Sequence, residues 1–140
     1  MSRNNFFLSL VFYLISFTSY SQILEPISWE FKVDSSNYSE SKQLDLIFEP
    51  TTEVGWYIYS SDNDPEAGPY TIFEFNENIT YTLQDELRVK NVKTKFDSVW
   101  FADVRYLDNG GAFIQPIIKN NNNLSVSGFI SYQVCSEIQK

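Results

Sequence analysis

Residues 27–33 read ISWEFKV, and this stretch decides the fold class. Its apolar side chains fall on every second position, at Ile27, Trp29, Phe31 and Val33, with polar residues between them. Successive side chains of a β-strand point to opposite faces, so this alternation gives one apolar and one polar face. The stretch therefore predicts a strand in a sheet that buries one of its faces.

Segments with strand character recur along the chain, separated by stretches rich in Asn, Asp, Gly, Pro and Ser, which favour turns. They cover residues 43–49, 55–60, 70–75, 79–83, 98–107, 112–118 and 124–134. Short strands at this spacing predict an all-β protein, an antiparallel β-sandwich, with an immunoglobulin-like two-sheet arrangement as the preferred version. Residues 83–92 have room for one helical turn. We interpret the aromatic-rich segment 55–60 mainly as core, with a binding platform as the lesser alternative.

Two local features refine the expected arrangement around residues 112–118. LDNGG (residues 107–111) and the asparagine run 120–123 bracket this strand at hairpin spacing, so the asparagine run is expected to be a hairpin loop. Pro116 lacks a backbone N–H, which predicts a sheet edge or a bulge at its position.

The N-terminus has the three-part pattern of a secretory signal peptide. Arg3 precedes an apolar run over residues 6–17, and the small residues Ser19 and Ser21 follow. The run is too short to span a membrane, which takes about 20 residues. We expect residues 1–21 to be a signal peptide and residues 22–140 to be one exported, periplasmic domain, with an uncleaved N-terminal anchor as the lesser alternative.

Composition excludes several classes of function. The net charge of -8 disfavours nucleic acids and anionic membrane surfaces as partners, because both bind clustered Lys and Arg. The sequence has no histidine, so catalytic Ser–His and Cys–His pairs are excluded. Residues 62–68 resemble the start of a calcium loop but lack its final bidentate glutamate. We interpret them as a solvated acidic loop, and expect no metal and no cofactor.

Cys135 is the only cysteine and has no partner for a disulfide within the chain. Alternation over residues 124–134 places the more apolar set at Gly128, Ile130, Tyr132 and Val134. Cys135 then falls on the less buried side or at the rim of the sheet, where its thiol is accessible. The competing interpretation is an inert, small apolar residue.

Five motifs follow one another in a recognisable order between residues 23 and 135. They are ILEPISWEF, GWYIYS, DPEAGPYTIFEF, KFDSVWFADVRYL and VSGFISYQVC. In this order they resemble the periplasmic N-terminal domain of the thiol:disulfide interchange protein DsbD. None of the motifs is diagnostic alone, and the resemblance rests on their order.

The resemblance implies an immunoglobulin-like sandwich that carries a redox-active cysteine pair near its C-terminal end. It implies electron transfer from a membrane-embedded partner domain to thioredoxin-like proteins. Cys135 matches the first cysteine of the pair and is the candidate catalytic residue. The loop before residue 71 matches a cap that shields the cysteines. Its candidate binding residues are Asp62, Asp64, Pro65, Glu66, Gly68, Pro69 and Tyr70.

The second cysteine that the resemblance implies is missing. It would follow Cys135 after four or five residues, and four lead to Lys140, the last residue of the sequence. A single thiol can form a mixed disulfide but cannot resolve it. Neighbouring charge does not activate it, because Glu137 is close and Lys140 is the only nearby cation.

Three functional hypotheses therefore stay open, and enzymatic activity remains uncertain. The first is a shortened or diverged DsbD-like domain that has lost dithiol chemistry. The second is a non-catalytic, exported protein-binding module. The third is a one-cysteine redox participant that joins a partner, or a second copy, through Cys135.

Overall fold

The computed structural model describes residues 25–36, 38 and 42–137. The predicted signal peptide, residues 1–21, lies outside the described residues. Antiparallel pairing joins the described strands into sheets. These strands are β1 (Ile27–Asp34), β2 (Gln43–Thr52), β3 (Trp56–Tyr59), β4 (Ile72–Phe75), β5 (Tyr81–Leu83), β6 (Arg88–Lys90), β7 (Lys93–Asp97), β8 (Ala102–Leu107), β9 (Ala112–Lys119), β10 (Gly128–Ser131) and β11 (Val134–Ser136).

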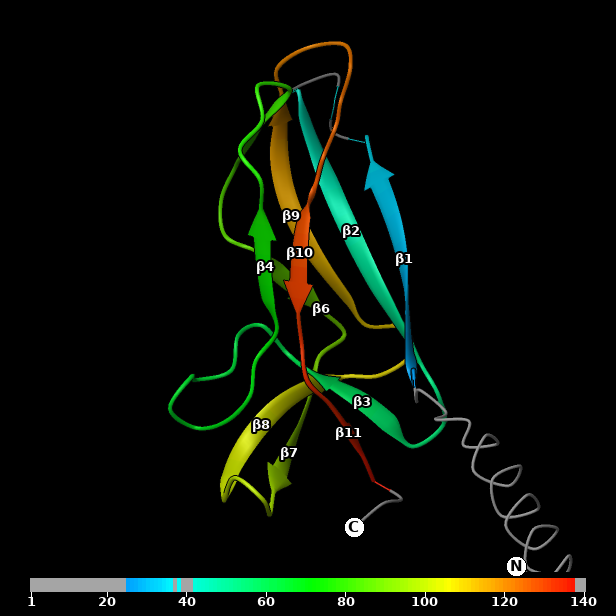
Figure 1. Cartoon of the computed structure of the whole chain (residues 1–140), viewed down its shortest axis with the longest axis vertical. Coiled ribbons are helices and arrows are strands. Elements are labelled where there is room, and N and C mark those ends of the chain that lie inside the picture. Colours follow the sequence, from blue (N-terminus) through cyan, green and yellow to red (C-terminus); the bar gives the residue numbers. More distant parts are fainter. Residues whose placement is uncertain (1–24, 37, 39–41, 138–140) are drawn as a thin grey trace, which may run out of the picture.

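The sheets are arranged in two layers (Figure 1). One layer is the sheet β1-β2-β9-β5, in which β6 also pairs with β9. The other contains the sheet β11-β3-β8-β7 and the two-stranded sheet β10-β4. In Figure 1, β4 and β10 lie in the upper half, and β3, β7, β8 and β11 lie below them. The all-β, antiparallel prediction is confirmed, in a sandwich-like arrangement of open sheets.

Aromatic and aliphatic side chains of the two layers meet in the core. Ile58 of β3, Leu107 of β8 and Phe113 of β9 are fully buried in one cluster. The ring centroid of Phe73 in β4 lies 5.0 Å from that of Phe113 and 5.0 Å from that of Phe48 in β2. Burying each large apolar side chain contributes about 1.5–3 kcal/mol, so this cluster holds the layers together.

A break in the hydrogen-bond ladder beside β9 accommodates Pro116. Along this side, β9 pairs with β5 as far as Ile117 and with β6 from Ile114, which leaves Gln115 and Pro116 between the two ladders. The Pro116 carbonyl accepts a 3.0 Å hydrogen bond from the Gln84 N–H on this side. The backbone N and O of one strand residue point the same way, so the missing N–H of Pro116 faces the gap and costs no ladder bond.

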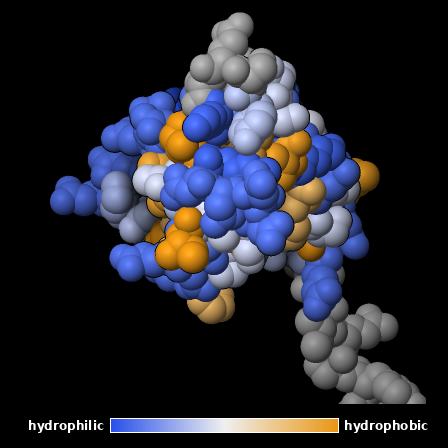
Figure 2. All heavy atoms as spheres, turned by 90° about the horizontal axis from the view of Figure 1, so that it is seen from above, coloured by the Kyte–Doolittle hydropathy of each residue, from blue (hydrophilic) through white to orange (hydrophobic). Residues whose placement is uncertain are grey.

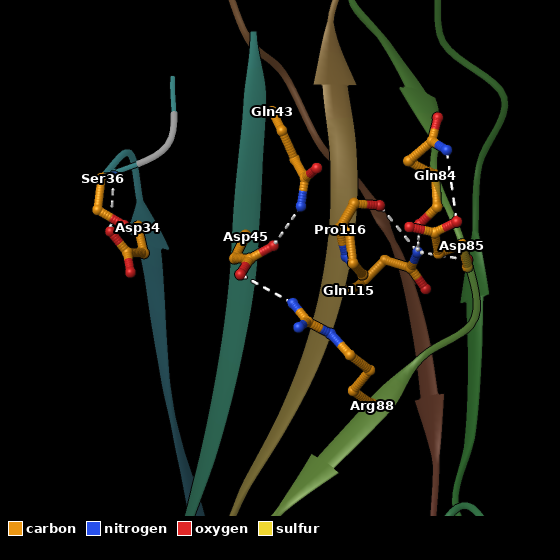
Figure 3. A network of polar contacts seen from close by, with 9 residues as sticks. All are labelled: Asp34, Ser36, Gln43, Asp45, Gln84, Asp85, Arg88, Gln115 and Pro116. Carbon is orange, nitrogen blue, oxygen red and sulfur yellow. Dashed lines mark hydrogen bonds and ion pairs between the residues drawn. The ribbon is translucent and has the colours of Figure 1, made fainter. Parts of the chain in front are cut away.

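The side chain of Gln115 closes this gap (Figure 3). Its Nε2 donates to the carbonyl oxygens of Gln84 and Asp85, at 3.2 and 3.3 Å, and to that of Pro116 at 2.9 Å. Gln115 is buried, and these bonds satisfy its amide where the ladder is missing. The prediction of a sheet edge at Pro116 is wrong, because β9 is an interior strand. On one side it pairs with two short strands, β5 and β6, and the gap between them lies at Pro116.

Three further predictions about local structure are wrong. The asparagine run 120–123 is not a hairpin loop, because β9 and β10 lie in different sheets and this turn crosses between layers. Residues 83–92 contain β6 in place of a helical turn. Residues 98–101 form the turn between β7 and β8 and do not begin a strand. A segment rich in turn-forming residues predicts a change in the direction of the chain, but it does not predict which strand the next segment pairs with.

The segment 124–134, predicted as one strand, contributes to two sheets. Its β10 part pairs with β4, and β11, which begins at Val134, pairs with β3. The partners of these two strands, β4 and β3, are themselves separated by a loop over residues 60–71. The break between β10 and β11 therefore matches the break between β3 and β4. The end of the molecule opposite this loop, seen from above in Figure 2, is mostly hydrophilic with separate hydrophobic patches.

Candidate functional site

Cys135 lies in the middle of β11, an edge strand of its sheet. It is directly opposite Tyr57 of β3 in the antiparallel register. Its neighbour Val134 packs into the core between the layers, whereas Cys135 packs on the other face of the sheet with Tyr57, Tyr59 and Val104. The thiol is half-buried.

Two tyrosine side chains lie between the Cys135 thiol and a buried carboxylate. Tyr57 packs against Cys135 and Tyr59 in one cluster, and the thiol itself hydrogen-bonds to the Ser136 carbonyl at 4.0 Å. Tyr59 Oη donates a 2.8 Å hydrogen bond to Asp97 Oδ2. Both tyrosine rings are buried, at 5.5 Å between centroids. A carboxylate only accepts, so the Tyr59 proton is directed to Asp97.

The surroundings keep both tyrosines protonated. Burial raises the pKa of Tyr57, and its hydrogen bonds with Cys135 and Tyr59 raise it further. Burial also raises the pKa of Tyr59, and the hydrogen bond to Asp97 adds to this effect. Each phenol is therefore a hydrogen-bond donor throughout the physiological pH range and not a base.

Asp97, which accepts the hydrogen bond from Tyr59, is a buried and ionised carboxylate. Burial opposes its ionisation, but the N–H groups of Val99 and Trp100, the Tyr59 hydroxyl and the charge of Lys95 outweigh burial and lower the pKa of Asp97. The Val99 N–H lies 2.9 Å from Asp97 Oδ1. Asp97 thus closes the turn after β7 and orients Tyr59 at the same time.

Lys95 brings a positive charge to this face from β7. Its Nζ lies 3.4 Å from the centroid of the Tyr57 ring and 4.9 Å from that of Tyr106. It also pairs with Glu137 Oε1 at 3.1 Å, two residues after Cys135. Lys95 lies 42 positions before Glu137 in the sequence, so no local pattern predicts that the two side chains meet. Lys95 offsets the negative charge of Glu137 beside the thiol.

Residues 61–70 form a loop closed at its neck, where the Thr71 N–H donates to the Ser60 carbonyl at 3.3 Å. Asn63 fixes the loop to β8: it donates to the Arg105 carbonyl at 2.9 Å and accepts from the Arg105 N–H at 2.7 Å. The Asn63 side chain also donates to the Pro69 carbonyl at 3.1 Å. This side chain was not among the predicted loop residues.

The loop packs over the face of the sheet that carries Cys135. A Cβ added at Gly68 would lie 3.4 Å from the Trp100 side chain and 3.5 Å from Val104. Val104 belongs to the same cluster as Tyr57, Tyr59 and Cys135. The loop therefore covers part of the aromatic surface next to the thiol, although the contacts described for it reach Val104 and not the sulfur itself.

The predicted loop residues have different surroundings. Asp62 pairs with Arg105 at 2.9 Å and accepts from the Ser60 hydroxyl at 2.6 Å. Asp64 Oδ1 accepts from the Glu66 N–H at 2.9 Å and shapes the turn. Gly68 and Pro69 are half-buried, and the exposed members are Asp62, Asp64, Pro65, Glu66 and Tyr70.

Comparisons with protein-family models, with curated proteins and with solved structures found no match to this chain. Within the described ranges, no three His, Cys, Asp or Glu side chains gather as a metal site requires. No helix in the described part of the chain has the length and apolar character to cross a membrane.

Proposed function

We propose that residues 22–140 are an exported, periplasmic thiol–disulfide exchange domain of the DsbD N-terminal type, with an immunoglobulin-like fold. In this proposal Cys135 forms mixed disulfides with thioredoxin-like or membrane redox partners. The observation that carries the proposal is the position of the Cys135 thiol, directly opposite Tyr57 on an edge strand of the sheet and beside a closed loop. The two open antiparallel layers support the immunoglobulin-like arrangement, and the signal-peptide pattern supports export.

The reaction needs one thiolate and a disulfide supplied by the partner. Cys135 loses its proton to solvent, and its sulfur attacks one sulfur of the partner disulfide. A new S–S bond forms between Cys135 and that sulfur as the old S–S bond breaks. The partner's other sulfur leaves as a thiolate and takes up a proton.

Tyr57 is the residue that would favour the thiolate. It lies directly opposite Cys135 and packs against it, so its hydroxyl can turn its proton towards a negatively charged sulfur. A hydrogen bond to the charged form of a group stabilises that form. Tyr59 stays directed to Asp97, so this change moves a single proton donor.

The single cysteine stops the reaction at the mixed disulfide. Resolution of a mixed disulfide requires a second thiol, and this sequence has no other cysteine. Release of the partner therefore needs a thiol from outside this sequence, either an external thiol or the one freed on the partner itself. The expected function is capture and release of a partner in envelope redox homeostasis, with impaired dithiol turnover.

A second candidate is a protein-binding module without thiol chemistry. Large apolar side chains are exposed around the turn from β7 to β8: Phe96 by 62%, Val99 by 72% and Phe101 by 81%. Trp100 of the same turn contacts the loop at Gly68. Such a patch is typical of a protein interaction site, and it serves either hypothesis as the docking surface.

The test is incubation of the full chain with an oxidised thioredoxin-like protein and, separately, with glutathione disulfide, followed by intact mass measurement. The thiol-exchange proposal predicts adducts in both mixtures that a reductant reverses and that Cys135→Ser abolishes. A partner complex that survives Cys135→Ser, without any adduct, would favour the binding module instead.

A further inference from the structure

The free edge of β1 has the features of a pairing surface. β1 is the terminal strand of its sheet and pairs only with β2 among the described strands. Figure 1 shows it at the margin of the layer. Its side chains Phe31 and Val33 are exposed by 62% and 54%. An edge strand of this length with exposed apolar side chains is a template for a further strand.

One hydrogen bond fixes which backbone groups of β1 point outward. The Glu53 N–H donates to the Pro26 carbonyl at 2.9 Å, so the pair 26 and 53 is of the hydrogen-bonded type. Such pairs alternate along an antiparallel ladder, so Ser28, Glu30 and Lys32 direct their N–H and C=O groups to β2. The corresponding groups of Trp29, Phe31 and Val33 therefore point away from the sheet.

The ladder on the other side of β2 supports this assignment. If odd-numbered residues of β2 bond to β1, Asp45 and its β9 partner Pro116 form a pair without hydrogen bonds between them. Pro116 has no N–H to give, and its carbonyl bonds to Gln84 on the opposite side. The Glu53–Pro26 bond and the position of Pro116 therefore indicate the same alternation of hydrogen-bonded and non-hydrogen-bonded pairs.

We propose that β1 is a self-association surface on which a second copy of this chain pairs through its own β1, antiparallel and centred on Phe31. In this register the Phe31 residues of the two copies exchange both backbone hydrogen bonds. Trp29 of each copy does the same with Val33 of the other. The two sheets become one continuous sheet across a two-fold axis.

Charge complementarity selects this register. Glu30 of each copy comes opposite Lys32 of the other, in the pairs without backbone hydrogen bonds, whose side chains lie closest. Within one copy, Lys32 already bonds to both Glu30 and Glu49, at 3.2 and 2.5 Å, so two acids share one lysine. A lysine from the second copy gives Glu30 a cation of its own.

Neighbouring registers are disfavoured by the same charges. A two-fold axis at Glu30 would bring the two Glu30 side chains together. An axis at Lys32 would oppose the two lysines and place Glu30 against Asp34. Registers shifted by a single residue would pair outward-pointing backbone groups with groups that already bond to β2.

The same pairing would also bury apolar side chains of β1. Phe31 and Val33 line a groove of about 510 Å³ between β1 and β10, where Phe129 is 68% exposed. The second copy would place its own Phe31 and Val33 on the same side of the continuous sheet. Burial of these side chains favours association.

The test is sedimentation velocity of the full chain over a concentration series in a reducing buffer, which removes any disulfide through Cys135. The expected result is a reversible monomer–dimer equilibrium. Glu30→Lys and Lys32→Glu should each weaken dimerisation on the order of tenfold or more, because each variant sets like charges opposite one another twice.

An equimolar mixture of Glu30→Lys and Lys32→Glu provides the decisive comparison. In the mixed dimer, the lysine introduced at position 30 of one copy faces the glutamate introduced at position 32 of the other. The native Lys32 and Glu30 form the second opposite-charge pair, so the mixture should associate more tightly than either variant alone. Circular dichroism of each variant confirms that it is folded. A wild-type chain that stays monomeric at every concentration, a mixture that does not associate, or a dimer that neither variant weakens would each overturn the proposal.

Discussion

The Tyr59 hydroxyl donates a 2.8 Å hydrogen bond to the carboxylate of Asp97, which lies 38 positions later in the chain. Tyr59 lies in β3 and Asp97 ends β7, and β8 lies between these strands in the sheet. The bond therefore spans two strand spacings beneath the aromatic face that carries Cys135. It links the stability of this sheet to the orientation of the hydroxyls that reach the thiol.

Asp97→Asn should destabilise the fold in a pH-dependent way. The pKa of Asp97 is lowered from 3.8 in the folded protein, so its contribution is complete above the unfolded pKa and is lost as pH falls through the folded pKa. We expect a loss of about 1.5–3 kcal/mol near pH 7, typical of hydrogen bonds to a charged group.

Urea unfolding of the wild type and Asp97→Asn between neutral and strongly acidic pH measures this difference. The gap in unfolding free energy should shrink below pH 3.8, the unfolded pKa of the Asp97 carboxyl. Asp103→Asn, which alters an exposed carboxylate of β8, is the matched control. A gap that does not depend on pH would show that the charge of Asp97 is not what stabilises the fold.

Tyr57→Phe should slow alkylation of Cys135 by about tenfold at neutral pH, because it removes the hydrogen-bond donor to the thiolate. The rate is measured by intact mass after timed addition of iodoacetamide. Tyr106→Phe changes another phenol of the same face, with its ring 5.1 Å from Tyr57, and should leave the rate close to that of the wild type. Equal rates in Tyr57→Phe and the wild type would remove the role given to this hydroxyl.

Asn63→Ala should loosen the loop and expose the face beneath it. The Asn63 side chain makes bonds of 2.7, 2.9 and 3.1 Å that join the loop to β8 and to its own end. We expect faster alkylation of Cys135 and earlier proteolytic cleavage within residues 61–70. Asp62→Ala removes an exposed ion pair with Arg105 and a hydrogen bond from the Ser60 hydroxyl but keeps the bonds between the loop and β8, so it should have a smaller effect. An unchanged alkylation rate in Asn63→Ala would mean that the loop does not limit access to the thiol.

The sequence predicted the elements with clear alternation and missed features set by distant contacts. Residues 27–33 predicted β1 to within one residue, although only Ile27 and Trp29 of the alternating apolar set are buried or half-buried and Phe31 and Val33 are exposed. β7 was missed because Lys93–Asp97 has only one large apolar residue, and the strand is held by its ladder to β8. Periodicity reports burial, whereas pairing depends on the partner strand.

The candidate site was predictable only in part. Cys135 and the loop were found as single features of the sequence. The surroundings of the thiol were not. The Tyr57 and Tyr59 rings were interpreted as core, and they are buried, but the Tyr59 hydroxyl also bonds to Asp97. Lys95 and Asp97 reach this face through the β7–β8 ladder, and no local pattern marks them.

Gly128→Ala should destabilise the protein by about 1–3 kcal/mol, as expected for an added methyl group that meets rigid neighbours. A Cβ at this position of β10 would overlap the backbone carbonyl oxygen of Glu74, so β4 and β10 would have to separate. Thermal unfolding compares this variant with Gly68→Ala, whose Cβ would lie 3.4 Å from Trp100, near ordinary contact. Equal melting temperatures for Gly128→Ala and the wild type would contradict the close approach of these strands.

The central claim is that the folded chain presents a thiol capable of disulfide exchange. The most direct measurement is the rate of exchange of Cys135 with glutathione disulfide, by intact mass, in native buffer and in denaturing urea. We predict measurable exchange in the native protein, within about tenfold of the rate in urea and slowed by Tyr57→Phe. Exchange that occurs only after unfolding would contradict the claim and leave Cys135 as a packing residue of β11.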